Sequence, residues 1–185
     1  QIKKKKSYIW SISPKDISNA LSKGFDATLD FSKISLVDVV IICVPTPLTK
    51  YGQPDLSYLI KSINSIMQHI KKGQLISIES TTYPGTTEEE VISRLEKKGF
   101  VVGKDIYVCY SPEREDPGNE SYSTRTIPKV VGAKTKDCLE VALSTYSSAI
   151  KKVVPVSSIK VAEMTKLHEN IYRLINIGLV NEMKM

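Results

Sequence analysis

The sequence predicts an α/β fold, in which helices cover both faces of a parallel β-sheet and a long helix follows the sheet. Two observations lead to this prediction. Short apolar segments rich in β-branched residues alternate with longer segments whose apolar residues recur at helical spacing. Residues 158–185 then continue in helical periodicity without another strand-like segment. The length of 185 residues suits one ordinary domain, or one domain and part of a second.

Five segments have the composition of strands. Residues 38–44 form a continuous apolar run, which is typical of a strand covered on both faces. Pro45 and Pro47 end this strand. The remaining strands are expected at residues 75–78, 105–110, 129–132 and 151–156.

Four segments have the apolar spacing of helices. The first begins at Asp55 and ends at Gly73, because glycine favours a helix end. The second covers residues 86–98, and the spacing of Thr86 and Glu89 predicts a capping box at its start. Strands and helices that alternate in this way form a parallel sheet wound on both faces. The last two helices are expected at residues 135–149 and 158–185.

Composition excludes several classes of function. The net charge is +6, but the basic run Lys3–Lys6 has no aromatic-interleaved basic patch beside it, so no nucleic-acid partner is expected. No segment approaches the roughly 18 consecutive apolar residues of a membrane span, and the basic N-terminal residues do not resemble a secretory signal. The three cysteines lack the spacing of a metal site. We therefore expect a cytoplasmic protein with no membrane partner and no bound metal.

Polar loops follow the first three predicted strands. Residues 44–47 hold a threonine between prolines, residues 79–85 carry several hydroxyl groups and a carboxylate, and residues 111–119 carry carboxylates beside Arg114. In parallel sheets, ligands bind at the carboxyl ends of the strands. Each loop alone could be ordinary turn chemistry. Three such loops at neighbouring strand ends predict a polar binding site.

The final helix carries three polar side chains close together. Lys166, Asn170 and Arg173 fall within about 60° of one another around the helix axis. One interpretation is a solvated stripe on an amphipathic helix. The other is a helix that packs on the sheet and directs an amine, an amide and a guanidinium into the site. The adjacent face is formed by Met164, Leu167, Ile171, Leu174 and Gly178.

Four segments of the sequence carry a resemblance to a known family. In chain order they are VPTPL, ESTTYPGTTEE, SPEREDPGN and AEMTKLHENIYRLINIGLVNE. Together they resemble the nucleotide-sugar 6-dehydrogenases of the UDP-glucose/GDP-mannose dehydrogenase family. The last two are most similar to the branch that acts on UDP-N-acetylhexosamines. The resemblance extends from Ser7 to Met185.

The resemblance implies how the chain is organised. Residues 1–157 would be a partial NAD-binding domain with an incomplete Rossmann-like sheet, because the family's first strand and glycine-rich phosphate loop have no counterpart here. Residues 158–185 would begin the central helix that links the family's domains and forms a dimer interface. The family's catalytic cysteine also has no counterpart. We therefore expect an internal fragment that does not catalyse turnover by itself.

The implied reaction is the NAD-dependent, four-electron oxidation of the C6 alcohol of a UDP-N-acetylhexosamine to the uronate, for surface polysaccharide biosynthesis. The sugar would be UDP-N-acetylglucosamine or UDP-N-acetylmannosamine. In this family two NAD+ and one water are consumed, and a cysteine holds the substrate first as a thiohemiacetal and then as a thioester.

The resemblance also implies roles for individual residues. Lys166 would be the catalytic lysine that stabilises the alkoxide and relays protons, and Asn170 would donate a hydrogen bond one turn later. Glu113 corresponds to the glutamate that activates water for thioester hydrolysis. Thr46 and Thr81 correspond to positions that contact NAD. The implied substrate-binding residues are Arg114, Glu115, Lys166, Asn170 and Arg173.

Alternatives remain open at the level of the sequence. Pro117 stands where UDP-glucose enzymes usually carry a second glutamate, which disfavours UDP-glucose 6-dehydrogenase but keeps it as an alternative. A non-catalytic module that forms a homodimer through residues 158–185 is another alternative. Thr46 and Thr81 could be ordinary strand-end hydroxyls, and Glu113 could be only a loop partner of Arg114.

Overall fold

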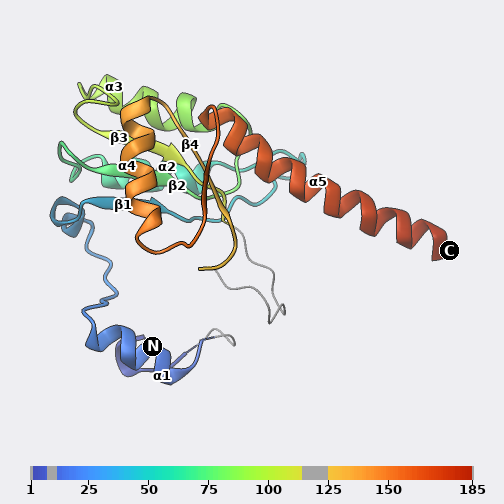
Figure 1. The fold of residues 1–185 in the computed structure, drawn as a ribbon, viewed down its shortest axis with the longest axis horizontal. Coiled ribbons are helices and arrows are strands. Elements are labelled where there is room, and N and C mark those ends of the chain that lie inside the picture. The colour runs from blue at the N-terminus through green and yellow to red at the C-terminus, as the bar shows by residue number, and fades with distance from the viewer. Residues whose placement is uncertain (1, 8–11, 114–124, 185) are drawn as a thin grey trace. The chain divides into compact units, whose positions relative to one another are not determined.

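The computed structural model describes residues 2–7, 12–113 and 125–184, which Figure 1 shows as a coloured ribbon. The chain forms two compact units, residues 1–33 and residues 34–185. The predicted division at residue 157 into a nucleotide-binding domain and a linking helix therefore stays a prediction about the larger protein.

The first unit contains the short helix η1 (Ile2–Lys4) and helix α1 (Pro14–Ser22). Ser13 and Asp16 form a capping box at the start of α1, in which the Asp16 carboxylate accepts the Ser13 N–H at 3.0 Å. Asp26 forms ion pairs with Lys3 and Lys33 at 3.3 and 3.2 Å. These exposed pairs add little stability.

The second unit is built on a five-stranded sheet. The strands lie in the order β1-β2-β3-β4-β5, so each strand neighbours the next in the chain. All five occur within the segments predicted as strands or one residue beyond them. Their bounds are β1 Val39–Ile42, β2 Leu75–Ile78, β3 Tyr107–Tyr110, β4 Lys129–Ala133 and β5 Val153–Pro155.

One pairing departs from the parallel arrangement. β1 and β2, β2 and β3, and β4 and β5 pair in parallel, whereas β3 and β4 are antiparallel, with Tyr110 opposite Gly132. A parallel return needs a crossover segment, usually a helix. The sequence of residues 111–128 has no helical periodicity, and β4 enters the sheet in the opposite direction. The predicted α/β class is confirmed, with this strand as its exception.

The helices differ from their predicted bounds mainly at their ends. The short helix η2 (Phe31–Leu36) precedes the sheet, and α2 covers Ser57–Ile66. Asp55 acts at the start of α2 as predicted, since its carboxylate accepts the Ser57 N–H at 2.9 Å. The prediction that this helix extends to Gly73 is wrong, because Gly73 has a φ of +89° in the turn before β2. The later helices are η3 (Thr87–Ile92), which is π-helical, α3 (Ser93–Lys97), α4 (Lys136–Ser147) and α5 (Ile159–Lys184).

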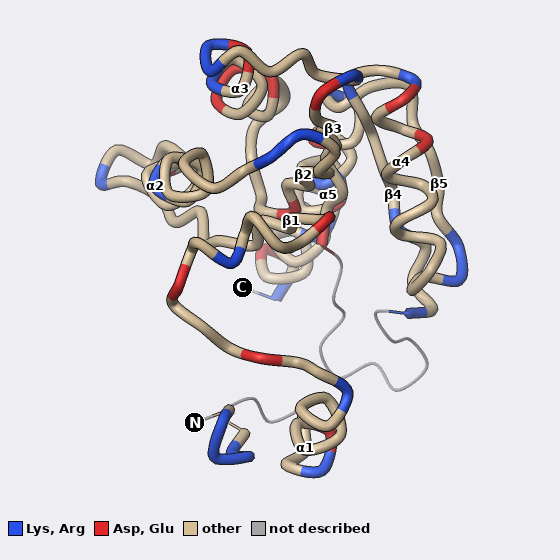
Figure 2. The backbone as a smooth tube through the Cα atoms, turned by 90° about the vertical axis from the view of Figure 1, so that its left-hand side faces the viewer, with Lys and Arg blue, Asp and Glu red and all other residues tan. Residues whose placement is uncertain are grey.

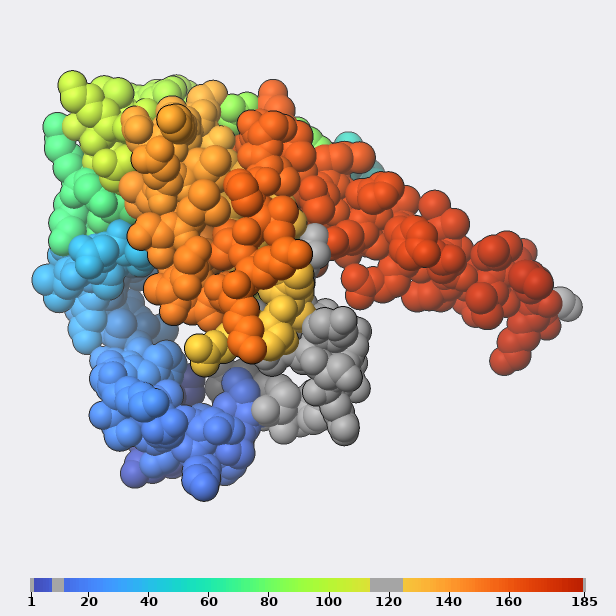
Figure 3. All heavy atoms as spheres, in the orientation of Figure 1, coloured from blue at the N-terminus to red at the C-terminus, as the bar shows by residue number. Residues whose placement is uncertain are grey.

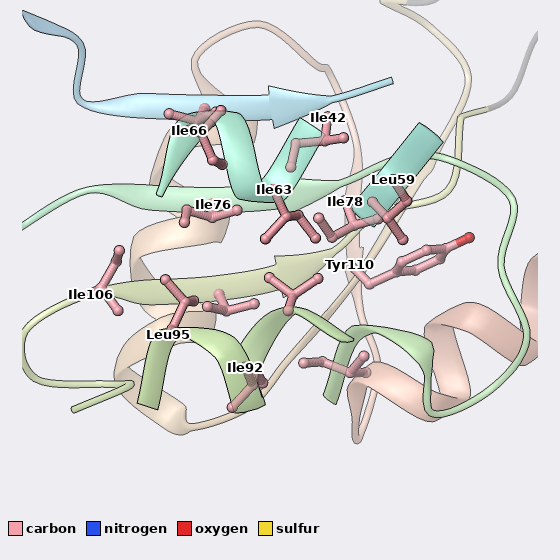
Figure 4. Packing of buried hydrophobic residues seen from close by; sticks show 14 of the residues in the cluster. Ile42, Leu59, Ile63, Ile66, Ile76, Ile78, Ile92, Leu95, Ile106 and Tyr110 are labelled. Carbon is pink, nitrogen blue, oxygen red and sulfur yellow. The ribbon is translucent and has the colours of Figure 1, made fainter. Parts of the chain in front are cut away.

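Helices cover both faces of the sheet, as the fold class requires. On one face α4 packs Ala142 and Tyr146 against the strands. On the other face α2, η3, α3 and the start of α5 bury a larger cluster of isoleucine, leucine and valine side chains. Figure 4 shows this cluster between the strands and the helices, with Ile63 and Leu95 facing Ile76 and Ile78. Burial of this apolar surface is the main stabilising term of the unit.

The first strand is covered less completely than its sequence predicted. Val40 and Ile42 are buried, but Ile41 is 48% exposed and Cys43 is also exposed. The continuous apolar run of residues 38–44 therefore does not mark a strand buried on both faces here. Adjacent side chains of a strand point to opposite faces: Val40 and Ile42 join the larger apolar cluster, whereas on the other face Val39 is only partly buried.

Helix α5 approaches β4 very closely at its start. A Cβ atom added to Gly132 would lie 2.3 Å from the Ser158 carbonyl oxygen and 2.8 Å from the Ala162 Cβ atom, so only glycine permits this approach. Ile159 and Ala162 are buried there. In Figure 3 the rest of α5 extends away from the sheet, with its surface uncovered. None of the described helices combines the length and the apolar character needed to cross a membrane.

Candidate active site

The polar loops that follow β1, β2 and β3 lie together, as the sequence predicted. The Val44 N–H donates to the Ser80 hydroxyl oxygen at 2.8 Å, which ties the loop after β1 to the loop after β2. The Tyr110 hydroxyl donates to the Ser80 carbonyl oxygen at 3.0 Å and ties the end of β3 to the same loop. The three strand ends therefore present one polar edge of the sheet.

Two predicted catalytic residues meet at this edge. The Lys166 Nζ atom donates to the Glu113 carbonyl oxygen at 2.7 Å, although the residues are 53 positions apart in the chain. Glu113 follows β3 directly, and Lys166 lies on the second turn of α5. Both side chains are only partly buried, so a ligand could reach them.

A buried network behind Glu113 was not predicted. The Lys129 Nζ atom forms ion pairs with Glu79 at 3.0 Å and with Glu113 at 3.4 Å. The Tyr146 hydroxyl donates to Glu79 at 2.5 Å and lies 2.6 Å from the Ser77 hydroxyl. Figure 2 shows the charged positions along the backbone; among residues assigned to the described strands, Lys129 alone is charged. In the sequence, the single charged residue at the start of an apolar strand was the feature that could have indicated this network.

Burial governs the ionisation of this network. Desolvation raises the pKa of the Glu79 carboxyl, and the hydrogen bond from Tyr146 and the charge of Lys129 oppose that increase. The neighbouring Glu113 carboxyl raises the pKa of Glu79 further. Burial also raises the pKa of Tyr146, so its hydroxyl stays protonated as a donor. The Glu79 and Glu113 carboxyls therefore interact with each other as well as with Lys129.

A second buried carboxylate fixes α5 to the loop after β2. Glu163 is fully buried and accepts hydrogen bonds from the Gly85 N–H at 2.6 Å and the Thr87 N–H at 2.9 Å. It also accepts from the Thr87 hydroxyl at 2.7 Å. A carboxylate is favourable at the start of a helix, where backbone N–H groups are unpaired. Glu163 thus supplies the cap of the η3 and α3 helical segment from a different helix.

This arrangement corrects the predicted capping box. The Thr86 hydroxyl donates to the Tyr83 carbonyl oxygen at 2.7 Å instead of accepting from the helix. The Glu89 carboxylate accepts from the Tyr83 hydroxyl at 3.0 Å. The spacing of Thr86 and Glu89 is right for a capping box, but the two N–H groups that such a box would use are bonded to backbone. The Thr86 N–H donates to the Tyr83 carbonyl oxygen at 3.1 Å, and the Glu89 N–H donates to the Gly85 carbonyl oxygen at 2.9 Å.

The other predicted site residues make no described contact with Glu113 or Lys166, or lie outside the described residues. Asn170 and Arg173 are exposed on α5, and among the described residues no hydrogen bond or ion pair joins them to Glu113 or Lys166. Thr46 and Thr81 are partly buried in the loops after β1 and β2. Arg114 and Glu115 lie outside the described residues. In the part of the chain that the structure covers, no group of three or more potential ligand side chains could hold a metal ion.

Comparison with known proteins identifies the class. Residues 1–150 match the NAD-binding domain of the UDP-glucose/GDP-mannose dehydrogenase family, and the chain belongs to this family. NAD is the cofactor of that domain.

Two proteins of known name are similar to this chain in sequence. Protein CapL of Staphylococcus aureus is 44% identical over 162 residues, which are 86% of this chain and 38% of CapL. UDP-N-acetyl-D-glucosamine 6-dehydrogenase of Pseudomonas aeruginosa is 40% identical over 158 residues, 84% of this chain and 37% of that protein. The chain thus spans less than two fifths of these relatives.

Two solved structures with a similar fold are nucleotide-sugar dehydrogenases. The UDP-D-ManNAc dehydrogenase of Pyrococcus horikoshii has a TM-score of 0.87 at 34% identity, over 98% of this chain and 44% of that one. A ternary complex of GDP-mannose dehydrogenase from Pseudomonas aeruginosa has a TM-score of 0.86 at 26% identity, over 98% and 43% of the two chains. The Rossmann-like fold predicted from the sequence is confirmed by these structures.

The loops after β1 and β2 have suitable groups for part of a nicotinamide nucleotide. Ser80 and Thr82 are buried, and the Ser80 hydroxyl already accepts the hydrogen bond from the Val44 N–H. Thr81, which stands between them in the chain, and Thr46, in the loop after β1, are partly exposed. Hydroxyl groups both donate and accept, which suits the carboxamide and ribose of NAD. The Thr46 and Thr81 hydroxyl groups thus have the chemistry of a ligand-binding position at the carboxyl ends of the strands, where ligands bind in this class of fold.

Replacing Glu163 tests its capping role. Glu163→Gln should lower the free energy of unfolding by about 1–3 kcal/mol, because the amide has one acceptor oxygen for several buried donors and brings an N–H₂ group against them. Urea unfolding measures the change. Glu182→Gln, at an exposed position of the same helix, is the matched control and should have no effect. Equal unfolding midpoints for both variants would refute the capping role.

Proposed function

We propose that the protein containing this chain is an NAD-dependent nucleotide-sugar 6-dehydrogenase that oxidises the C6 alcohol of a UDP-N-acetylhexosamine to the uronate. The contact between Lys166 Nζ and the Glu113 carbonyl oxygen is the observation that supports this proposal most directly. It places an ammonium group and a carboxylate residue at the sheet edge where ligands bind in this class of fold. Oxidation of an alcohol to an acid needs both kinds of group.

Each residue has a role in the proposed reaction. The Lys166 ammonium stabilises negative charge on the C6 oxygen and relays its proton, and Asn170 donates to the same region one turn along α5. Glu113 accepts a proton from the water that releases the acid. NAD, when bound, accepts the hydride from C6. Arg173, with Arg114 and Glu115, binds the nucleotide sugar.

The cysteines of this chain are poor candidates for the nucleophile. Cys109 and Cys138 are buried, and burial raises the pKa of Cys109 to about 12. Desolvation, together with the charges of Glu79 and Glu113, raises the pKa of the exposed Cys43. A thiol acts as a nucleophile through its thiolate form, which these surroundings disfavour. We therefore assign the covalent steps of the reaction to no cysteine of this chain.

The names of the relatives support the substrate class. The relative from Pseudomonas aeruginosa is a UDP-N-acetyl-D-glucosamine 6-dehydrogenase, and those from Methanocaldococcus jannaschii and Pyrococcus horikoshii are UDP-N-acetyl-D-mannosamine dehydrogenases. Their identities to this chain lie between 37% and 40%. An N-acetylhexosamine is therefore a better-supported substrate than UDP-glucose, while the choice between the two epimers is left to experiment.

NADH formation by the protein expressed from the complete reading frame tests the proposal. UDP-N-acetylglucosamine, UDP-N-acetylmannosamine and UDP-glucose are compared side by side, and one N-acetyl sugar should yield about two NADH per molecule. Lys166→Ala should reduce the rate at least about 100-fold, because it removes the charge that stabilises the alkoxide. Lys160→Ala, which removes an exposed lysine of α5, is the control and should retain activity.

The possible results separate the candidates. Turnover of UDP-glucose alone would replace the proposed substrate by the alternative one. Absence of NADH with all three sugars would contradict the proposed activity. Full activity of Lys166→Ala would remove this lysine from the mechanism.

We also propose that the protein forms a homodimer through α5. Large apolar side chains on the second half of α5 are all at least 46% exposed, and an uncovered surface of this kind marks an interface in many proteins. A two-fold dimer would pair the helix with its own copy. The exposed residues are Ile171, Tyr172, Leu174, Ile175, Ile177, Leu179, Val180 and Met183.

Sedimentation velocity of the complete protein tests the dimer. Leu174→Asp should convert a dimer to a monomer, because it places a charge in the apolar contact. Ser144→Asp introduces the same charge on an exposed position of α4 and should leave the dimer intact. A monomeric unsubstituted protein, or a dimer that persists in Leu174→Asp, would rule out this interface.

A further inference from the structure

Lys129 is a buried cation between two carboxylates of unequal exposure. Its side chain is 9% exposed, and the Glu79 side chain with which it pairs is 6% exposed. The Glu113 side chain, the second partner, is 41% exposed and belongs to the proposed active site. Lys129 thus connects the interior of the sheet to the site.

The sheet topology explains how Lys129 reaches Glu113. β4 is antiparallel to β3, with Tyr110 opposite Gly132 and Cys109 opposite Ala133. Continuing this register beyond the end of β3 places Glu113 opposite Lys129. A parallel β4 would begin at the other end of the sheet. The antiparallel strand is therefore what brings a lysine to the carboxyl end of β3.

The interior end of the network is rigid. Glu79 is held by Lys129 on one carboxylate oxygen and by the Tyr146 hydroxyl on the other. Tyr146 is in turn hydrogen-bonded to Ser77 of β2, and the Lys129 Nζ atom lies 5.2 Å from the centroid of the Tyr146 ring. Lys129 consequently has few alternative positions.

A contribution to folding stability does not readily explain why Lys129 and Glu79 form a buried ion pair. Replacing a buried ion pair by apolar side chains of similar size is often neutral or stabilising, because the charges no longer need to be desolvated. The network is also larger than Lys129 needs, since Glu79 already neutralises it. Its extension to Glu113 therefore points to a role in the site.

We propose that Lys129, held by Glu79, is a positioning residue for Glu113. It holds the Glu113 carboxylate while Lys166 holds the carbonyl oxygen of the same residue, so that Glu113 is fixed at both its side chain and its backbone. This inference rests on the proposed function, because it concerns the water-activating step of that reaction.

The step that Lys129 supports is hydrolysis of the substrate thioester on a cysteine of the complete protein. Water adds to the thioester carbonyl carbon, and one of its protons passes to the Glu113 carboxylate. The carbon–sulfur bond then breaks, and the proton held by Glu113 passes to the leaving sulfur. The products are the carboxylic acid and the thiol, with no change in oxidation state. Both hydride transfers precede this step, so they should not depend on Lys129.

Rapid mixing of the complete protein with NAD+ and the N-acetyl sugar separates the two stages. With Lys129→Met we expect a fast burst of about two NADH per active site, followed by steady turnover reduced about 100-fold. Mass spectrometry of the quenched protein should then show the sugar attached to the cysteine. Lys129→Arg keeps the charge and should recover most of the turnover. Lys134→Met, an exposed lysine next to β4, is the matched control and should behave like the unsubstituted protein.

A double variant covers the case in which Lys129→Met does not fold because Glu79 is left buried without its partner. Glu79→Leu with Lys129→Met removes both buried charges and should fold, with the same burst and slow turnover. Several results would overturn the inference: unchanged turnover, loss of the burst with both stages slowed equally, or failure of the double variant to fold. If the unsubstituted protein forms no NADH, the proposed function itself fails, which is a different result.

Discussion

The buried Glu163 carboxylate is the interaction on which the arrangement of the site depends. It is fully buried, and its charge is balanced by N–H and hydroxyl donors from Gly85 and Thr87 rather than by a cation. With the close approach at Gly132, it attaches the first two turns of α5 to both β4 and the loop after β2. Lys166 follows Glu163 by about one turn, so this attachment determines where the lysine lies.

Glu113 is held from two directions that originate in different parts of the sheet. Lys166 reaches it from α5, and Lys129 reaches it from the start of β4. The antiparallel direction of β4 is essential to the second contact. The antiparallel strand and the single charged residue among the described strands thus act together, since they bring a lysine beside the glutamate for which we propose the water-activating role.

The sequence predicted the elements better than their connections. Apolar runs located every strand, because each strand contributes side chains to the apolar clusters between the sheet and the helices. The direction of β4 could not be read from its sequence, since Val130 and Val131 suit either pairing. Glu163 resembled an ordinary glutamate of an amphipathic helix, and its partner N–H groups lie more than 70 residues away in the chain. The family resemblance assigned Lys166 and Glu113 to one site without predicting their contact. Glu79 was expected only as part of a polar loop, and Lys129 was not expected in the site.

A crystal structure of the complete protein with NADH and a UDP-N-acetylhexosamine tests the account most directly. The C6 oxygen of the sugar should lie within hydrogen-bond distance of Lys166 Nζ, with the Glu113 carboxylate facing the same carbon and still paired with Lys129. A sugar bound away from the carboxyl ends of β1–β3, or Lys166 and Glu113 separated in the complex, would contradict the account.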